Sequence, residues 1–258
     1  MLSFFRKKRW RLAQDNQILK DSRYAAGEIL LVVVGILIAL QINTWNGHRL
    51  ERKEEVKILK GIKKELENTI SEFEFHNEIR SAVLDASVRI YEQANAQELD
   101  KETLDSLIGM TFYRPTFNNK LGYINLLFTS GKINLIQNDS IKEFLIQWPG
   151  FIEDMVEEED YAMVMLQDHY YPILAKYLMV NTLLEQTHVT SFISNDVREV
   201  YFGQAPVQSD HEGLIKDKLF LNHLRMRASH FAINNSESRS LIAKAESVIE
   251  TINDEMEE

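Results

Sequence analysis

The feature that most constrains this chain is an uninterrupted apolar run of twelve residues, 29–40, which reads Ile-Leu-Leu-Val-Val-Val-Gly-Ile-Leu-Ile-Ala-Leu. A helix built from these residues is apolar on every side, so it needs apolar surroundings in all directions. Twelve residues span only about 18 Å of helix, whereas the hydrocarbon core of a bilayer is about 30 Å thick. The flanking residues therefore decide what kind of helix this is.

Extending the window to residues 24–45 gives 22 residues in which Glu28 is the only ionisable side chain. Aromatic residues stand at both ends of this window, and basic residues crowd both flanks, as is typical of membrane interfaces. The ten Ile, Leu and Val residues within residues 29–40 favour insertion by about 3–6 kcal/mol. Glu28 lies about one turn from the end, so it costs less than the roughly 3 kcal/mol of a central charge. We therefore predict a transmembrane helix over residues 24–46, with Arg23, Tyr24 and Trp45 as its interfacial anchors.

Two alternatives to a transmembrane helix stay open from the sequence. A cleaved signal peptide is the first, although residues 39–45 contain no small-x-small cleavage site. A buried helix in the core of a soluble protein is the second, because a twelve-residue apolar run also suits that role.

Charge is distributed unevenly along the chain. Residues 1–27 hold seven bases and two acids, and residues 46–65 hold seven bases and four acids, whereas the whole chain has a net charge of −10. Five bases cluster within residues 6–11 on a short tail, and long domains cross membranes largely regardless of their charge. We therefore expect residues 1–23 to form a basic cytoplasmic tail and residues 47–258 an acidic extracytoplasmic domain at a bacterial inner membrane.

The acidic character of the main domain bears on its partners. Outside the two basic segments and Glu28, the chain carries a net charge of −17. A surface of this sign repels phosphate, which argues against a nucleic acid as partner. The alternative is that the charge only keeps a helical surface soluble.

One face of the predicted membrane helix is suited to helix packing. Glu28, Gly35, Ala39 and Ile42 follow one another at spacings of seven, four and three, so they share one side. Gly35-x-x-x-Ala39 is a small-x-x-x-small pair, which allows close approach of a second helix. We expect this face to bind a second copy of the chain or another envelope membrane protein. The alternative is that Glu28 reaches the interface and that Gly35 is incidental.

Residues 27–43 read Gly-Glu-Ile-Leu-Leu-Val-Val-Val-Gly-Ile-Leu-Ile-Ala-Leu-Gln-Ile-Asn, followed by Trp45-Asn46. This segment resembles that of an uncharacterised bacterial family of single-pass membrane proteins, which begin Phe-Phe-Arg and carry a GEI-LVV-GILIALQIN-WN motif. The opening Phe4-Phe5-Arg6 fits the resemblance, and residues 127–138 fit it more loosely. The resemblance implies a single-pass anchor with a helical extracytoplasmic part, and it implies no activity.

Apolar stripes at helical spacing occupy both ends of the predicted domain. Residues 49–97 place an apolar side chain every three or four positions, which predicts one long helix. Residues 221–256 show the same spacing, interrupted by two polar residues, Asn235 and Ser238. We name the second stripe the C-terminal seam, and it includes Leu224, Phe231, Ile242 and Ile249.

Low proline content and these stripes predict an all-α fold. The transmembrane helix is expected to continue into the long helix, on which a C-terminal helical hairpin and the middle helices pack as an elongated bundle. Asn235 could fix the register of the seam, or residues 234–236 could break the last helix with Ser236 as a cap. A further alternative is that the seam forms an intermolecular coiled coil.

The middle of the chain is expected to contain shorter helices and a loop. Gly131 is a favourable helix stop and Asn138 a favourable cap, whereas Pro149-Gly150 should kink or split the helix that follows. Helices are expected near 101–112, 117–130, 139–168 and 172–186, and a loop over 189–212.

Residue patterns for catalysis or metal binding are weak. There is no cysteine, so no thiolate chemistry is available. The acids of residues 157–160 point around a helix and are expected to be solvated, and Glu185-x-x-His188 is only half of a carboxylate-bridged di-metal motif. His223 and His230 share a face but have no evident third ligand.

An aromatic concentration marks residues 144–171. It indicates core packing, with a ligand or partner groove as the alternative. We therefore expect no enzyme activity, no cofactor and no metal. The function expected is that of a membrane-anchored scaffold or accessory subunit, with an extracytoplasmic ligand-binding sensor as the alternative.

Overall fold

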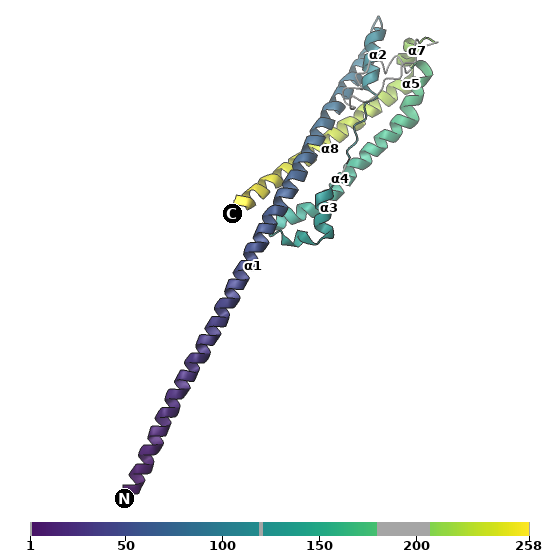
Figure 1. Cartoon of the computed structure of the whole chain (residues 1–258). Coiled ribbons are helices and arrows are strands. Elements are labelled where there is room, and N and C mark those ends of the chain that lie inside the picture. The colour runs from purple at the N-terminus through teal and green to yellow at the C-terminus, as the bar shows by residue number, and fades with distance from the viewer. Residues whose placement is uncertain (1, 119–120, 180–206, 258) are drawn as a thin grey trace. The chain divides into compact units, whose positions relative to one another are not determined.

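Figure 1 shows the computed structural model of the chain, which describes residues 2–118, 121–179 and 207–257. The described residues are helical with short connections, and no strand occurs among them. The expected all-α fold is thus confirmed. Two compact units divide the chain, Met1–Lys57 and Ile58–Glu258, and we call the second unit the body.

Helix α1, Leu2–Gln93, is 92 residues long and contributes to both units. It contains the apolar run of residues 29–40 and the first apolar stripe, so the expected continuation of one helix into the other is observed. The helix ends at Gln93, four residues before the expected end near residue 97. A turn follows Gln93 and leads to α2.

The body contains the remaining helices, several of which begin or end at residues suited to that role. Asp100 caps α2 by accepting the N–H of Thr103 at 3.1 Å. Gly131 follows α3 with a φ of 70°, a left-handed conformation that favours glycine. Asn138 caps α4 by accepting two backbone N–H groups, as expected from the sequence. The elements are α2 Lys101–Met110, α3 Gly122–Thr129, the 3-10 helix η1 Lys132–Leu135, α4 Asp139–Met165, the π-helical turn η2 Leu166–Tyr170, α5 Tyr171–Tyr177, α7 His211–Lys216 and α8 Lys218–Glu257.

Helix α4 passes through Pro149 without a break, so Pro149-Gly150 does not split the helix, one of the two outcomes expected there. Leu145, Trp148 and Ile152 are fully buried around the proline. Their burial holds both halves of the helix on the core, and it outweighs the loss of one backbone hydrogen bond. Helix α5 ends at Tyr177, and the rest of the helix expected over 172–186 and most of the loop expected over 189–212 lie outside the described residues.

Helix α8 is also continuous, so the expected break at residues 234–236 does not occur. It runs antiparallel to the part of α1 that lies in the body (Figure 1). Lys63 bonds to Asn253 at 2.8 Å, Asn77 to Ser238 at 2.6 Å, and Ser81 to Asn235 at 3.3 Å. Along these three bonds the residue number rises in α1 and falls in α8 by nearly the same amount. The two helices therefore pack antiparallel in a single register.

Helix α4 packs along α8 over most of its length. Asn138 at the start of α4 bonds to Glu255 near the end of α8 at 2.7 Å. At the other end of this pair, the ring of His169 stacks on that of His223 with centroids 5.4 Å apart. The body is therefore built on three long helices, α1, α4 and α8, as an elongated bundle.

Two apolar cores lie along this bundle. The core nearer the start of the body, which we call the lower core, contains Phe73, Trp148 and Leu241 among others. The core nearer the end of α1, which we call the upper core, contains Ile90, Leu166 and Leu224 among others. Buried polar side chains occupy the level between them. We name this level the polar layer, and its buried members are His76, Arg80, Glu159, Arg227, Asn234, Asn235 and Ser238.

Candidate functional site

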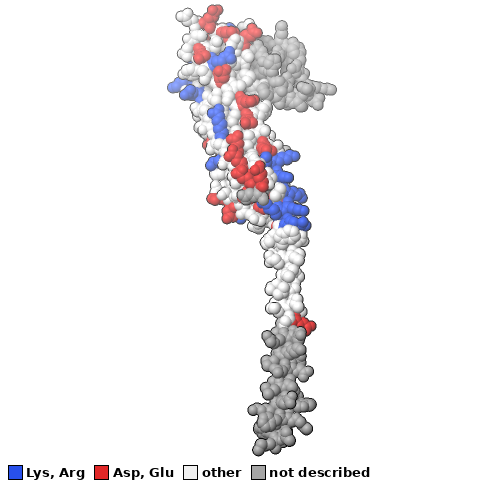
Figure 2. Space-filling model, turned by 90° about the vertical axis from the view of Figure 1, so that its left-hand side faces the viewer, with Lys and Arg blue, Asp and Glu red and all other residues white. Residues whose placement is uncertain are grey.

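The apolar run of α1 is exposed along its whole length. Its large aliphatic side chains, from Ile29 to Ile42, are between 42% and 75% exposed. Figure 2 shows this stretch as an uncharged length of helix that is followed by a group of Lys and Arg residues. None of this apolar stretch is buried in the structure. A core helix of a soluble protein, the second alternative, would be mostly buried. One helix among the described residues is long and apolar enough to span a membrane, and it is the helix that contains this stretch. A signal sequence near the N-terminus has the same length and composition.

The expected packing face lies on this exposed length. Glu28, Gly35, Ala39 and Ile42 are all exposed, and the space next to the α-carbon of Gly35 is open. Trp45 is 64% exposed, and the guanidinium of Arg49 lies 5.8 Å from the centroid of its indole ring. The side chains of Arg23 and Tyr24 lie outside the described residues.

The C-terminal seam packs inside the body. Leu224 and Phe231 are buried, whereas Ile242 and Ile249 are half-buried against the lower core. The buried positions near these two are Leu241, Ala245 and Ile252. The centre of the seam is therefore shifted by one residue at some positions, and its apolar side chains contact helices of the same chain.

An ion pair between α1 and α4 forms the centre of the polar layer. The guanidinium of Arg80 donates from Nη2 to Oε1 of Glu159, and the two side chains are 0% and 3% exposed. Glu159 also accepts the backbone N–H of Phe117 at 2.7 Å. Burial raises the pKa of Glu159, which the Phe117 N–H and the charge of Arg80 oppose. The expectation that residues 157–160 are all solvated was therefore wrong for Glu159.

Amide and hydroxyl groups from α1 and α8 continue the polar layer. The hydroxyl of Ser238 donates to the side chain of Asn77, and the amide of Asn235 donates to Ser81. His76 is buried next to Arg80, and burial followed by the charge of Arg80 lowers its pKa to about 4. His76 is therefore neutral at pH 7, and its Nδ1 atom has no hydrogen-bond partner among the described residues.

Arg227 brings a second buried cation to the layer. Its Nη2 donates to the backbone carbonyl of Tyr113 at 2.6 Å, and its guanidinium lies 4.7 Å from the ring centroid of Phe231. Burial lowers its pKa to about 10, so it remains charged at neutral pH. No carboxylate pairs with it within the described part of the chain. A backbone dipole and aromatic faces therefore stabilise this charge.

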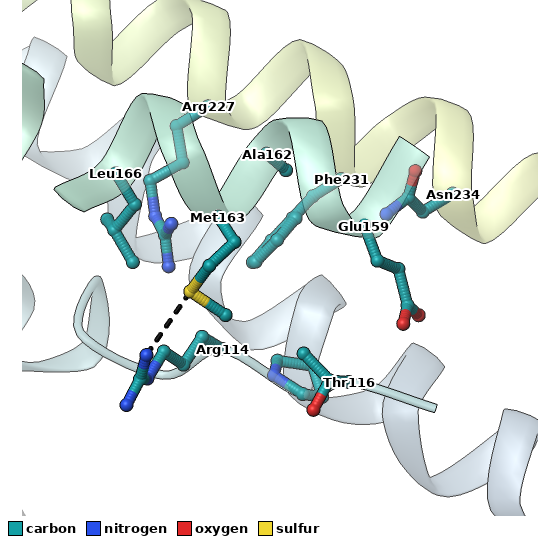
Figure 3. Close-up of a pocket in the computed structure, with 10 residues that line it drawn as sticks. Arg114, Thr116, Glu159, Ala162, Met163, Leu166, Arg227, Phe231 and Asn234 are labelled. Carbon is teal, nitrogen blue, oxygen red and sulfur yellow. Dashed lines mark hydrogen bonds between the residues drawn. The ribbon is translucent and has the colours of Figure 1, made fainter. Parts of the chain in front are cut away.

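A small hollow opens beside Arg227 (Figure 3). Arg227 from α8 points into it, and Arg114 on the loop after α2 donates to the sulfur of Met163 at 3.2 Å. Glu159 and Asn234 also line this hollow. Its volume of about 10 Å³ is the space of a single water molecule. The arrangement thus fits a hydrated polar layer in a bundle.

The aromatic residues of the middle segment mostly pack in the core. Trp148 and Tyr170 are 0% and 1% exposed, and Phe144 lies against Trp148 with ring centroids 4.9 Å apart. The hydroxyl of Tyr170 is 2.8 Å from that of Thr111. Tyr161 differs, because it is 52% exposed. Core packing therefore accounts for most of this concentration.

His223 and His230 do not converge on a common point. His223 stacks on His169, whereas His230 lies against Tyr161 and 3.9 Å from Glu158. In the described residues, no group of three or more His, Cys, Asp or Glu side chains is arranged to hold a metal ion. The Glu185-x-x-His188 motif lies outside the described residues.

A surface groove runs between α1 and α8 near the upper core. Its volume is about 350 Å³, and Tyr91 and Val88 of α1 and Leu221 and Arg225 of α8 contribute to its lining. Val88 and Tyr91 are each more than half exposed. Exposed apolar side chains beside a groove are typical of protein interaction surfaces.

The comparisons with known proteins bear on the first half of the chain. Residues 28–147 match DUF6090, a family of unknown function. The match begins at Glu28 and extends into α4, and it agrees with the resemblance to an uncharacterised family that the apolar motif carries. No curated protein and no solved structure matches the chain.

Proposed function

We propose that this chain is a membrane-anchored helical scaffold or accessory subunit that acts through protein–protein interaction in the bacterial envelope. The observation that carries the proposal is the exposed apolar length of α1 from Ile29 to Ile42. A continuous apolar cylinder of this length is unfavourable in water, whereas it is stable in hydrocarbon. The interfacial position of Trp45 and the bases after it support the same conclusion.

The proposed topology places the N-terminus in the cytoplasm and residues 47–258 outside the inner membrane. The support is the cluster of five bases within residues 6–11, since short basic segments stay inside. In this arrangement the body presents its helical surface and the groove beside Tyr91 to envelope partners.

The contents of the body also favour a scaffold over a ligand-binding sensor. A sensor of the expected kind needs a cavity around the aromatics of the middle segment. Trp148 and Tyr170 fill the interior of that region, and the hollow beside Arg227 holds about 10 Å³. The larger hollow beside Phe144 and Phe151 is open to the surface. A packed polar layer instead gives a rigid body suited to holding a partner in place.

Carbonate extraction of membranes that contain the full-length chain tests the anchor. We expect the chain to stay in the membrane pellet at its full length, with added protease reaching the body only from the outer side. Release by carbonate, or loss of the N-terminal segment from the mature protein, would contradict the anchor.

Purification in mild detergent tests the interaction part of the proposal. We expect a homo-oligomer or co-purifying membrane subunits by light scattering and mass spectrometry. A monomer without any companion, from membranes in which the anchor is intact, would contradict the scaffold function while leaving the anchor in place.

A further inference from the structure

Three basic side chains form an exposed line directly after the apolar length of α1. Arg49, Lys53 and Lys57 are spaced four residues apart, so they lie on one side of the helix, and all three are exposed. We name these three residues the basic stripe. They belong to the same unit as the apolar run and as Trp45.

The neighbouring acids leave most of this stripe uncompensated. Arg52 pairs with Glu55 at 2.7 Å, and His48 lies 3.4 Å from Glu51, so these contacts engage acids with bases outside the stripe. Glu54 lies 4.0 Å from Lys57 at the far end of the stripe. Within the described residues, Arg49 and Lys53 have no carboxylate at ion-pair distance. The stripe thus presents net positive charge.

Arg49 and Lys53 lie closest to the level of lipid headgroups, and Lys57 lies beyond that level but within the range of electrostatic attraction. At about 1.5 Å per residue, Arg49, Lys53 and Lys57 lie about 6, 12 and 18 Å beyond Trp45. The headgroup layer extends about 5–7 Å beyond the hydrocarbon on each side, and a flexible basic side chain adds a reach of several ångströms. Arg49 also lies over the indole of Trp45, which fixes its charge beside an interfacial aromatic.

We propose that the basic stripe binds the phosphodiester headgroups of anionic glycerophospholipids in the leaflet next to Trp45. This proposal rests on the membrane anchor proposed above. Each base near an anionic membrane surface strengthens binding by about fivefold at moderate salt. The stripe therefore gives the anchor a preference for anionic over zwitterionic lipid.

Native mass spectrometry of the full chain tests this preference. The purified chain in mild detergent is mixed with equal amounts of palmitoyl-oleoyl phosphatidylglycerol and phosphatidylcholine, and the bound lipids are counted. We expect at least fivefold more phosphatidylglycerol than phosphatidylcholine. We expect a ratio close to one for the variant R49Q/K53Q/K57Q, and a loss of preference in the wild type when ionic strength is raised tenfold.

Two control variants separate charge from folding. The variant K101Q/K218Q/R239Q removes three exposed bases of the body and should keep the preference of the wild type. The variant R49K/K53R/K57R conserves the charge of the stripe and should keep it as well. The helix content of every variant is compared by circular dichroism. If the stripe variant loses helix content together with its lipid preference, the charge-conserving variant R49K/K53R/K57R decides whether the charge of the stripe sets the preference.

Each remaining outcome overturns the proposal in a distinct way. A wild-type ratio near one, or an equal ratio in the stripe variant, contradicts lipid binding by the stripe even if carbonate extraction supports the anchor. Displacement of the bound lipid by an excess of soluble glycerol 3-phosphate would show a site for free phosphate rather than for a lipid headgroup. Carbonate release of the wild type would instead contradict the anchor itself.

Discussion

The carboxylate of Glu159 on α4 pairs with the guanidinium of Arg80 on α1, 79 residues earlier in the chain. Both side chains are almost completely buried, and Glu159 also receives the backbone N–H of Phe117. Removal of two charges from water is costly, and their mutual attraction with added hydrogen bonds offsets this cost. The pair therefore contributes specificity to the packing of α1 on α4 more than net stability.

Loss of one partner of this pair should be far more damaging than loss of both. Arg80→Met leaves Glu159 buried without its cation, and we expect the free energy of unfolding to fall by about 3–5 kcal/mol. The double variant R80M/E159M should recover most of that loss, since apolar side chains of similar size fill the same space. Urea unfolding of the full chain in mild detergent, followed by near-ultraviolet circular dichroism, measures these differences. A double variant as unstable as the sum of the single variants would contradict this account.

Apolar residues at helical spacing predict the long helices, but they leave out the polar residues on the buried side of α1. The buried side of α1 advances strictly by three and four residues and includes polar Thr69, His76, Arg80 and Ser87. A strict count would have placed Arg80 in the core, and the same count along α4 reaches Glu159 from Trp148 and Met155.

Other features could not be predicted from a single sequence. Two buried charges at core positions on separate helices are compatible with many pairings, and only the register of α1 against α4 selects Arg80 with Glu159. The cation of Arg227 is stabilised by the carbonyl of Tyr113 and by the ring of Phe231, and such contacts leave no spacing signal. The apolar run of α1, in contrast, was identified by composition alone.

His76 should make the stability of the body depend on pH. Burial lowers its pKa to about 4 from the ordinary value of 6.5, so the unfolded chain takes up a proton there at higher pH than the folded chain. Its contribution to the free energy of unfolding is thus fully present above pH 7 and is lost as pH falls toward 4. The loss is about 3 kcal/mol at most. Unfolding of the full chain at pH 7 and pH 4.5 measures it.

The variant His76→Leu is the control for this titration. Glu159 acts in the opposite direction, because burial raises its pKa and the folded chain therefore binds that proton more readily as pH falls. Only the difference between the wild type and the variant isolates His76. We expect the wild type to lose about 2 kcal/mol more than His76→Leu over this range. Equal losses in the two proteins would show that His76 does not titrate as described.

Gly35 allows the apolar length of α1 to approach a second helix. The space beside its α-carbon is open, and Ala39 follows one turn later on the same side. Gly35→Leu should reduce self-association in detergent micelles by about tenfold or more, since bulk at the crossing point keeps two backbones apart. Val33→Leu, on the opposite side of the helix, is the matched control. Analytical ultracentrifugation compares them, and unchanged association of Gly35→Leu would exclude this face as the contact.

Gly61 lies inside a long helix for a reason that the fold supplies. An alanine methyl group at this position would overlap the ring of Tyr123, which packs against α1 next to the bond between the Tyr123 N–H and Glu65 at 2.7 Å. Alanine favours a helix over glycine by about 1 kcal/mol, but overpacking a core costs about 1–3 kcal/mol. We therefore expect Gly61→Ala to destabilise the body by about 1–2 kcal/mol in urea unfolding of the full chain.

Gly150 provides the matched control for that prediction, because it also lies inside a helix but has open space beside its α-carbon. Gly150→Ala should stabilise the body by up to about 1 kcal/mol, since only the backbone effect remains. In a Tyr123→Leu background, where the ring is absent, Gly61→Ala should no longer destabilise. If Gly61→Ala is as stabilising as Gly150→Ala in the wild-type background, Tyr123 does not pack on Gly61, and the docking of α3 on α1 has to be revised.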